Sequence, residues 1–131
     1  MITLEEARSI ISAAKEKAKE IGQPMNVAVV DAGTNLKAFD RMEGAWLGSI
    51  DIAINKAFTA ASFKLSTQEF AEMAQPRQPL FGIHTTNDGR VVVFAGGIPL
   101  EGDGEVVGAV GVSGGTVDQD QQIAEADAAA F

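Results

Sequence analysis

A glycine-rich turn at residues 112–116 holds the residue types best suited to bind an anionic ligand. Ser113, Gly114 and Gly115 follow a predicted strand, and Thr116 precedes a predicted helix. The N-terminus of a helix exposes unpaired N–H groups and the positive end of the helix dipole, so it can hold a phosphate or a carboxylate. Glycines let a ligand approach the backbone closely. The same residues also fit a tight strand-to-helix connection that is capped by Thr116 and binds nothing.

Gly96 and Gly97 form a second point at which a ligand could approach the backbone. They precede Ile98 and Pro99 in a short apolar segment. A glycine pair at this position is also typical of a bulge in a sheet. The pair becomes a candidate for ligand binding if the fold places it beside the turn at residues 112–116.

Three charged residues are candidates for the wall of a binding pocket: Arg41, Asp51 and Lys56. Asp51 and Lys56 lie on a predicted helix, and Arg41 comes shortly before it. A buried lysine changes its pKa readily and can act as a base or a nucleophile. Together with the amides of residues 113–116, Lys56 and Asp51 could hold a small carboxylate metabolite. A structural ion pair, or a lysine whose ammonium group reaches solvent, is the alternative for Lys56.

His84 is the one histidine, and it is the strongest neutral nitrogen ligand available for a metal or a haem iron. It lies in a long irregular segment, residues 75–89, and connections of this length inside a compact domain are often functional. The chain has no cysteine and no tyrosine. Thiolate chemistry and a zinc site built from several Cys and His residues are therefore excluded. A surface histidine without a ligand is the alternative.

The composition indicates one globular domain over residues 1–131. Hydrophobic residues make up 46% of the chain, which is enough for a core. The net charge of −8 and the lack of a basic cluster in the sequence argue against binding to nucleic acid or to an anionic membrane surface. No apolar run approaches the ~20 residues of a membrane span. Charged residues at positions 5, 6 and 8 stand where a signal peptide needs an apolar run, so we expect a cytoplasmic protein.

Capping residues and apolar spacing predict the helices that must position these residues. Three pairs have capping-box spacing and predict helices that begin near residues 3, 66 and 116: Thr3 with Glu6, Ser66 with Glu69, and Thr116 with Gln119. A further helix follows residues 41–45. Its apolar residues recur at intervals of three and four, which predicts that it packs through Leu47, Ile50, Ile54, Ala57 and Ala61.

Strands are predicted at residues 26–31, 36–40, 91–95 and 105–112. Asp31 is the acid of the tight turn between the first two strands, and we expect Gly33 to supply its unusual backbone angles. Residues 101–104 form another polar turn. Consecutive strands joined by short turns imply an antiparallel sheet with helices packed on it, an α+β fold.

Taken together, several of these stretches resemble the GlcG/HbpS family. The matching motifs are VAVVDAG at residues 27–33, RMEGA at 41–45, SIDIAINKA at 49–57 followed by Thr59 and Ala60, GGIPL at 96–100, and GAVGVSGG at 108–115 followed by Gln119 and Asp120. Relatives often have Asp in place of Glu43. The resemblance runs nearly from end to end, and these motifs in this order are far more specific than any one glycine run.

The resemblance implies an antiparallel five-stranded sheet with helices packed on it, of the profilin/PAS-like kind, and homodimers that can assemble into octamers. It also implies a haem-binding or tetrapyrrole-binding protein, linked to haem handling or accessory to metabolite use, with its pocket shaped by residues 96–99 and 113–116. Thr116 matches a threonine that contacts haem in one branch of the family, whereas His84 lies outside the matching motifs. The secreted haem-binding members carry a signal peptide, which we do not find here. An enzyme or binder acting on a small carboxylate at residues 113–116 and Lys56, or a purely accessory subunit, stays open.

Overall fold

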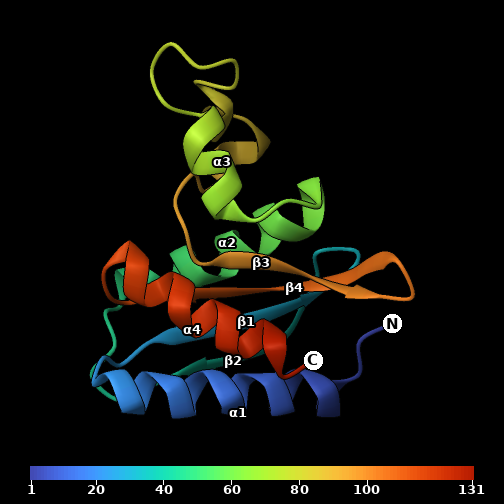
Figure 1. Cartoon of the computed structure of the whole chain (residues 1–131), viewed down its shortest axis with the longest axis vertical. Helices are drawn as coiled ribbons and strands as arrows, with labels where there is room; N and C mark the ends of the chain where they lie inside the picture. The colour runs from blue at the N-terminus through green and yellow to red at the C-terminus, as the bar shows by residue number, and fades with distance from the viewer.

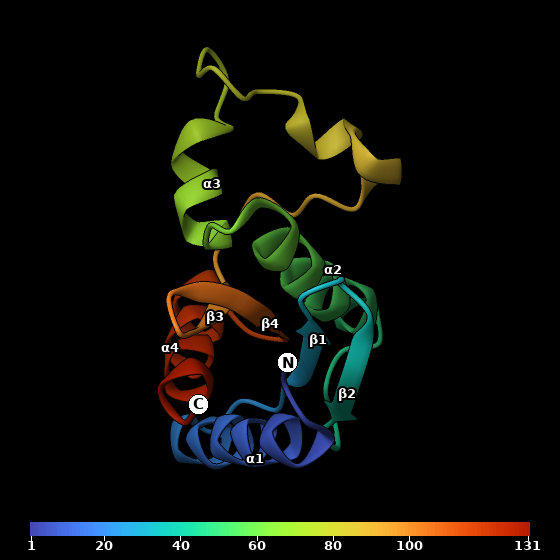
Figure 2. The same ribbon diagram turned by 90° about the vertical axis from the view of Figure 1, so that its right-hand side faces the viewer.

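The computed structural model describes residues 1–131 and shows an antiparallel sheet with helices on both faces (Figures 1 and 2). In chain order the elements are α1 (Leu4–Ile21), β1 (Asn26–Asp31), β2 (Leu36–Arg41), α2 (Gly48–Phe63), α3 (Thr67–Met73), the 3-10 turns η1 (Ile83–Thr85) and η2 (Asn87–Gly89), β3 (Gly97–Gly102), β4 (Glu105–Ser113) and α4 (Val117–Ala129). The strand order is β2-β1-β4-β3. The predicted α+β class is confirmed. No helix has both the length and the apolar character needed to cross a membrane.

Helices α1 and α4 cover one face of the sheet and pack against each other (Figure 2). The largest apolar cluster fills this side, and it includes Ile10, Ile11 and Ala14 of α1, Ile123 and Ala124 of α4, and the valines at 27, 29, 110 and 112. Both helices begin with the predicted capping box, formed by Thr3 with Glu6 and by Thr116 with Gln119. Ser66 caps α3 as predicted.

Helix α2 covers the opposite face through small residues. Ala53, Ala57, Ala60 and Ala61 pack with Ala28, Val30 and Ala109 of the sheet. The packing face predicted from the apolar spacing is confirmed at Ala57 and Ala61, which are buried. It was wrong at the larger residues, because Leu47 is 70% exposed and Ile50 and Ile54 are only partly buried. The reason is steric: a Cβ on Gly111 of β4 would collide with the carbonyl oxygen of Ala53 and lie 2.6 Å from the amide nitrogen of Ala57. The backbones are too close for large side chains to fit between them.

The sheet has four strands and not the five that we expected. Residues 91–95, predicted as a strand, form no ladder. The N–H of Val92 donates instead to the hydroxyl of Thr59 on α2, and the ring of Phe94 lies over the ammonium of Lys56 on the same helix. The apolar character of this segment is thus used to cover α2, and the strand that follows is β3.

The β1–β2 turn forms where it was predicted, but with a different residue in the left-handed conformation. Asp31 Oδ1 accepts from the N–H groups of Gly33 and Asn35, both at 2.9 Å. Thr34 has φ 66°, whereas Gly33 has no positive φ, so the expectation for Gly33 was wrong. The hydrogen bonds of Asp31 fix the conformation of the loop, and in this conformation Thr34, not Gly33, has the positive φ.

The segment between α3 and β3 extends away from the sheet (Figure 1). We call residues 74–90 the arm. It consists of turns and two short 3-10 pieces, and most of its residues are exposed. Phe81, in the arm, is 58% exposed. The arm therefore adds little to the core of the chain.

The close contact between α2 and β4 should make Gly111→Ala strongly destabilising. We expect a loss of about 3 kcal/mol in the free energy of unfolding, because the added methyl group must push two backbones apart. Urea unfolding at equilibrium measures this loss. The matched control is Gly48→Ala on α2, the helix that Gly111 faces, where a Cβ would meet nothing within 4 Å; a change below about 0.5 kcal/mol is expected there. Equal effects of the two substitutions would contradict the steric account.

Asp127 of α4 is a buried carboxyl group without a partner. It is 0% exposed, and neither carboxyl oxygen has a hydrogen-bond partner. Burial raises its pKa well above the usual value, since a buried carboxylate loses its hydration. The folded protein therefore holds this proton more tightly than the unfolded chain does.

This linkage gives a pH dependence of definite sign. The contribution of protonated Asp127 is fully present below the unfolded pKa of about 4 and is lost as the pH rises from there through the raised folded pKa. The side chain introduced by Asp127→Asn cannot ionise. The free energy of unfolding of the variant, relative to that of the wild type, should therefore rise between pH 4 and pH 7. The gain should be at most about 1.4 kcal/mol per pH unit. Urea unfolding of both proteins across this range measures it, and a difference that stays constant with pH would refute the assignment.

Candidate functional site

Lys56 lies at the centre of the residues that the sequence singled out. It comes from α2 and is 0% exposed. Its ammonium nitrogen Nζ donates to the carbonyl oxygen of Val112 at 2.8 Å and to Oδ2 of Asp120 at 2.9 Å. The ring of Phe94 lies 5.1 Å from Nζ. The lysine thus joins α2, the end of β4 and the first turns of α4.

Asp120 connects this lysine to the glycine-rich turn. Its second oxygen, Oδ1, accepts from the N–H of Gly115 at 3.0 Å. Burial lowers the pKa of Lys56 and raises the pKa of Asp120, and the attraction between the two opposes both changes. Three hydrogen bonds and the opposite charges compensate for the loss of water around the pair.

Gly96 and Gly97 lie directly beside Lys56. A Cβ on Gly96 would lie 2.6 Å from Nζ of Lys56, and one on Gly97 would lie 2.5 Å from the carbonyl oxygen of Lys56. Their N–H groups donate to Gln121 Oε1 and to Thr67 Oγ1. The expected proximity of residues 96–97 to the 113–116 turn is therefore present, and the chain's own side chains occupy the space that these glycines leave.

At the 113–116 turn, the chain uses most of its own N–H groups. The N–H of Thr116 donates to Gln119 Oε1, and the N–H of Gln119 donates to Thr116 Oγ1. The N–H of Gly115 donates to Asp120 Oδ1. Ser113 and Gly114 are buried, whereas Thr116 is exposed. The surface of the turn thus offers the Thr116 hydroxyl and the first free amides of α4, those of Val117 and Asp118.

The other predicted residues lie outside this cluster. Asp51 is exposed in the first turn of α2, and Arg41 is exposed at the end of β2. His84 is exposed in η1 of the arm, with its ring 6.0 Å from that of Phe81. No three His, Cys, Asp or Glu side chains are grouped closely enough to hold a metal ion.

Sequence reasoning did not assign roles to three residues that complete the site: Thr67, Asp120 and Gln121. All are buried and polar. One signal was available in the sequence: Asp120 and Gln121 directly follow the capping residue Gln119. Residues in the first turns of a helix lie close to the turn that precedes it. The partner of Asp120 lies 64 residues away in the chain, so spacing could not reveal it.

An exposed apolar surface flanks the same end of the sheet. Asn26, at the start of β1, pairs in register with Ser113, and its side-chain amide donates to the carbonyl oxygen of Trp46 at 2.9 Å. Trp46 is 60% exposed, and Val117, beside Thr116, is 47% exposed. Oδ1 of Asn26 is buried and has no hydrogen-bond partner. This end of the sheet therefore combines a hydroxyl, apolar side chains and one unsatisfied acceptor.

The family model described as "Haem degrading protein HbpS-like" matches residues 2–129. The chain belongs to the HbpS-like family. It is 45% identical over 124 residues, 95% of this chain and 87% of the relative, to a 15.0 kDa protein from the dhaT-dhaS intergenic region of Citrobacter freundii. It is 36% identical over 130 residues to the corrinoid adenosyltransferase PduO of Salmonella typhimurium, covering 99% of this chain but only 39% of that enzyme.

Among solved structures, a complex of PduOC with haem is similar to this HbpS-like chain. The TM-score is 0.95 with 36% identity, and the match covers 99% of this chain and 94% of that one. The predicted resemblance to the GlcG/HbpS family is thus confirmed, and the haem in that complex belongs to PduOC.

Removing one partner of the buried ion pair should be costly. Lys56→Met leaves Asp120 buried with one remaining donor, so we expect a loss of about 3–5 kcal/mol in the free energy of unfolding. The double variant Lys56→Met/Asp120→Asn should lose less than the sum of the two single variants, because it leaves no unpaired charge. Urea unfolding provides all three values. Lys17→Met, which breaks only an exposed pair with Glu20, serves as the control. Strictly additive losses would show that the two groups do not depend on each other.

Proposed function

We propose that this chain binds haem or a related tetrapyrrole at the surface where Thr116 caps α4. The observation that carries the proposal is the match of the whole backbone to PduOC, a relative whose structure contains haem. Family membership supports the same class of ligand.

The residues at this end of the sheet fit a porphyrin in their chemistry. The Thr116 hydroxyl is exposed and could face the iron, and Trp46, Leu47 and Val117 offer apolar surface for the ring. The buried Asn26 Oδ1 lacks a donor in the chain, and a water molecule at this end of the sheet can supply one. A bound haem supplies an iron centre that takes axial ligands and changes oxidation state.

The available iron ligands favour reversible binding. The chain has no cysteine or tyrosine, and its one histidine lies on the exposed arm. A threonine hydroxyl is a weak ligand beside the histidine or thiolate that holds a permanent haem. Haem handling, in which the ligand is taken up and passed on, therefore fits this donor set better than a fixed prosthetic group does.

We also propose that the chain associates with itself, as a homodimer or an octamer. Leu47 is 70% exposed, Trp46 60% and Phe81 58%. Large apolar side chains at these levels of exposure on two separate segments are typical of surfaces that another chain covers.

Titration of the purified protein with haemin, followed by absorbance, tests the haem proposal. We expect a saturable Soret band near one haem per chain or per dimer, weakened or shifted in Thr116→Ala. Thr116→Ser keeps the hydroxyl and should restore the wild-type spectrum. His84→Ala tests whether the arm supplies the second ligand.

The capping role of Thr116 needs its own control, because the substitution also removes a helix cap. Thr3→Ala removes the equivalent cap from α1 and should leave the Soret band unchanged. A featureless spectrum that does not saturate would refute haem binding. A normal spectrum in Thr116→Ala would refute the location.

A further inference from the structure

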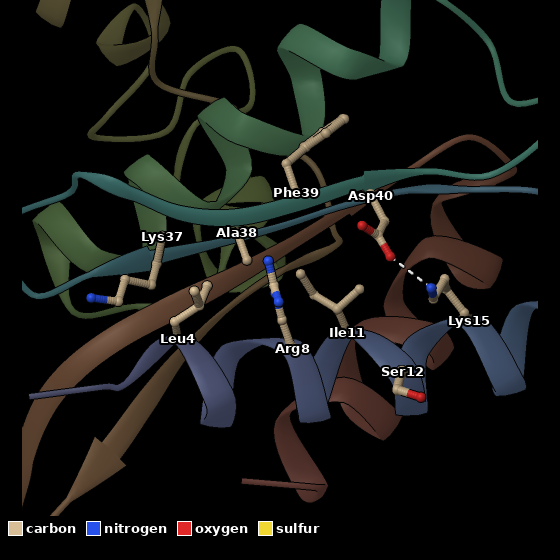
Figure 3. A pocket seen from close by; sticks show the side chains of 9 residues that line it. All are labelled: Leu4, Arg8, Ile11, Ser12, Lys15, Lys37, Ala38, Phe39 and Asp40. Atoms are coloured by element: carbon tan, nitrogen blue, oxygen red, sulfur yellow. Dashed lines mark ion pairs between the residues drawn. The ribbon is translucent and has the colours of Figure 1, made fainter.

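A groove between α1 and β2 lies away from the Thr116 surface. Two hollows of about 470 and 460 Å³ share Lys15, Phe39 and Asp40, so they form one continuous groove. Figure 3 shows the first of them, with Arg8, Ile11 and Lys15 pointing from α1 toward the strand. Ligand pockets in proteins commonly have volumes of ~300–1,000 Å³, so the groove has room for a small molecule.

Positive charge is concentrated along this groove. The chain carries a net charge of −8 and 10 lysines and arginines in all. Five of them line the two hollows: Arg8, Lys15, Lys19, Lys37 and Arg41. A cluster of cations on an otherwise acidic protein creates a local positive potential that attracts anions.

Three of these cations form no ion pair, although the charge of Lys37 helps to lower the pKa of Asp31. Lys15 pairs with Asp40 at 2.6 Å, and Lys19 lies 3.8 Å from Glu16. Arg8, Lys37 and Arg41 form no ion pair. Arg8 and Lys37 both line the first hollow, one from each wall. Their charges are therefore free to bind an anion from solution.

The open edge of β2 has unpaired backbone donors beside this groove. β2 pairs with β1 alone. The N–H of Met42 donates to the carbonyl oxygen of Met25, and in an antiparallel ladder the bonded positions alternate. The N–H groups of Phe39 and Arg41 then point away from β1, toward the open side. A carboxylate accepts hydrogen bonds from such groups and from guanidinium and ammonium groups alike.

Part of the groove wall is apolar. Leu4, Ile11 and Ala38 are among the residues that line the first hollow, and Leu4 is the most exposed of the three. Leu4 is 42% exposed even though it starts the apolar face of α1. An inorganic anion would leave this surface in contact with water, whereas a ligand with an apolar body would cover it.

We propose that the groove between α1 and β2 binds a small molecule that carries a carboxylate on an apolar body. Arg8 and Lys37 bind the carboxylate, and Leu4 and Ala38 contact the body. The site does not depend on the haem site at Thr116, and it places carboxylate recognition on a different face from Lys56. A free aliphatic or aromatic acid and the propionate arms of a tetrapyrrole share this chemistry.

Titration with octanoate, followed by amide chemical shifts in NMR, tests the proposal. We expect saturable shifts for residues of α1 and β2, and an affinity about tenfold lower in Arg8→Gln and in Lys37→Gln. Lys17→Gln removes one charge from the same helix outside the groove and should bind as the wild type does. Octanol, which lacks the charge, and acetate, which lacks the apolar body, should both bind more weakly than octanoate. Shifts that do not saturate, or equal affinities in all three variants, would overturn the proposal.

Competition with haemin identifies the source of the carboxylate. Displacement of octanoate by haemin, still seen in Thr116→Ala, assigns the groove to tetrapyrrole propionates. Simultaneous binding of both assigns it to a free amphipathic acid. If octanoate saturates the groove while haemin gives no Soret band, the haem proposal is refuted and the carboxylate proposal is supported. If haemin gives a Soret band while octanoate does not saturate, only the carboxylate proposal is refuted.

Discussion

A buried ammonium group at the meeting point of three elements constrains much of this structure. Lys56 is fully buried on α2, and its charge requires acceptors because water cannot reach it. The carbonyl oxygen of Val112 and the carboxylate of Asp120 provide them, so the end of β4 and the start of α4 must lie where they do. Gly96 and Gly97 follow from the same constraint, since a Cβ on either would overlap with atoms of the lysine. The sheet, both helices and the glycine turn are fixed around one side chain.

The helices pack on the two faces of the sheet through side chains of different size. On the α1 and α4 side, the buried cluster contains the larger side chains, among them isoleucines and valines. On the α2 side, alanines meet Gly111 with the backbones almost in contact. This close approach brings the Lys56 side chain within reach of the last residues of β4 and of α4. The small residues on α2 are thus a condition for the buried ion pair.

Local patterns predicted the elements of the fold, and long-range contacts decided the rest. Capping boxes placed the starts of three helices, because their hydrogen bonds lie within four residues of one another. The predicted face of α2 was right at Ala57 and Ala61 and wrong at Leu47 and Ile50, since apolar spacing assumes that large residues point inward and cannot know that the opposing strand carries a glycine. Residues 91–95 were mistaken for a strand because an apolar run does not reveal whether it will cover a sheet edge or a helix. The site was half predicted: the glycines and Lys56 were named, but Asp120 needed the fold to bring it to the lysine.

The glycine runs that first suggested a ligand cradle are explained largely by contacts within the chain. A Cβ on Gly114 would lie 2.8 Å from the carbonyl oxygen of Pro24, and one on Gly96 would lie 2.6 Å from Nζ of Lys56. A binding site is better sought where the chain leaves its own chemistry unsatisfied. Two surfaces meet that criterion: the exposed hydroxyl and apolar residues around Thr116, next to the unpartnered oxygen of Asn26, and the unpaired cations of the α1–β2 groove. The first suits a flat apolar ligand, and the second suits a carboxylate.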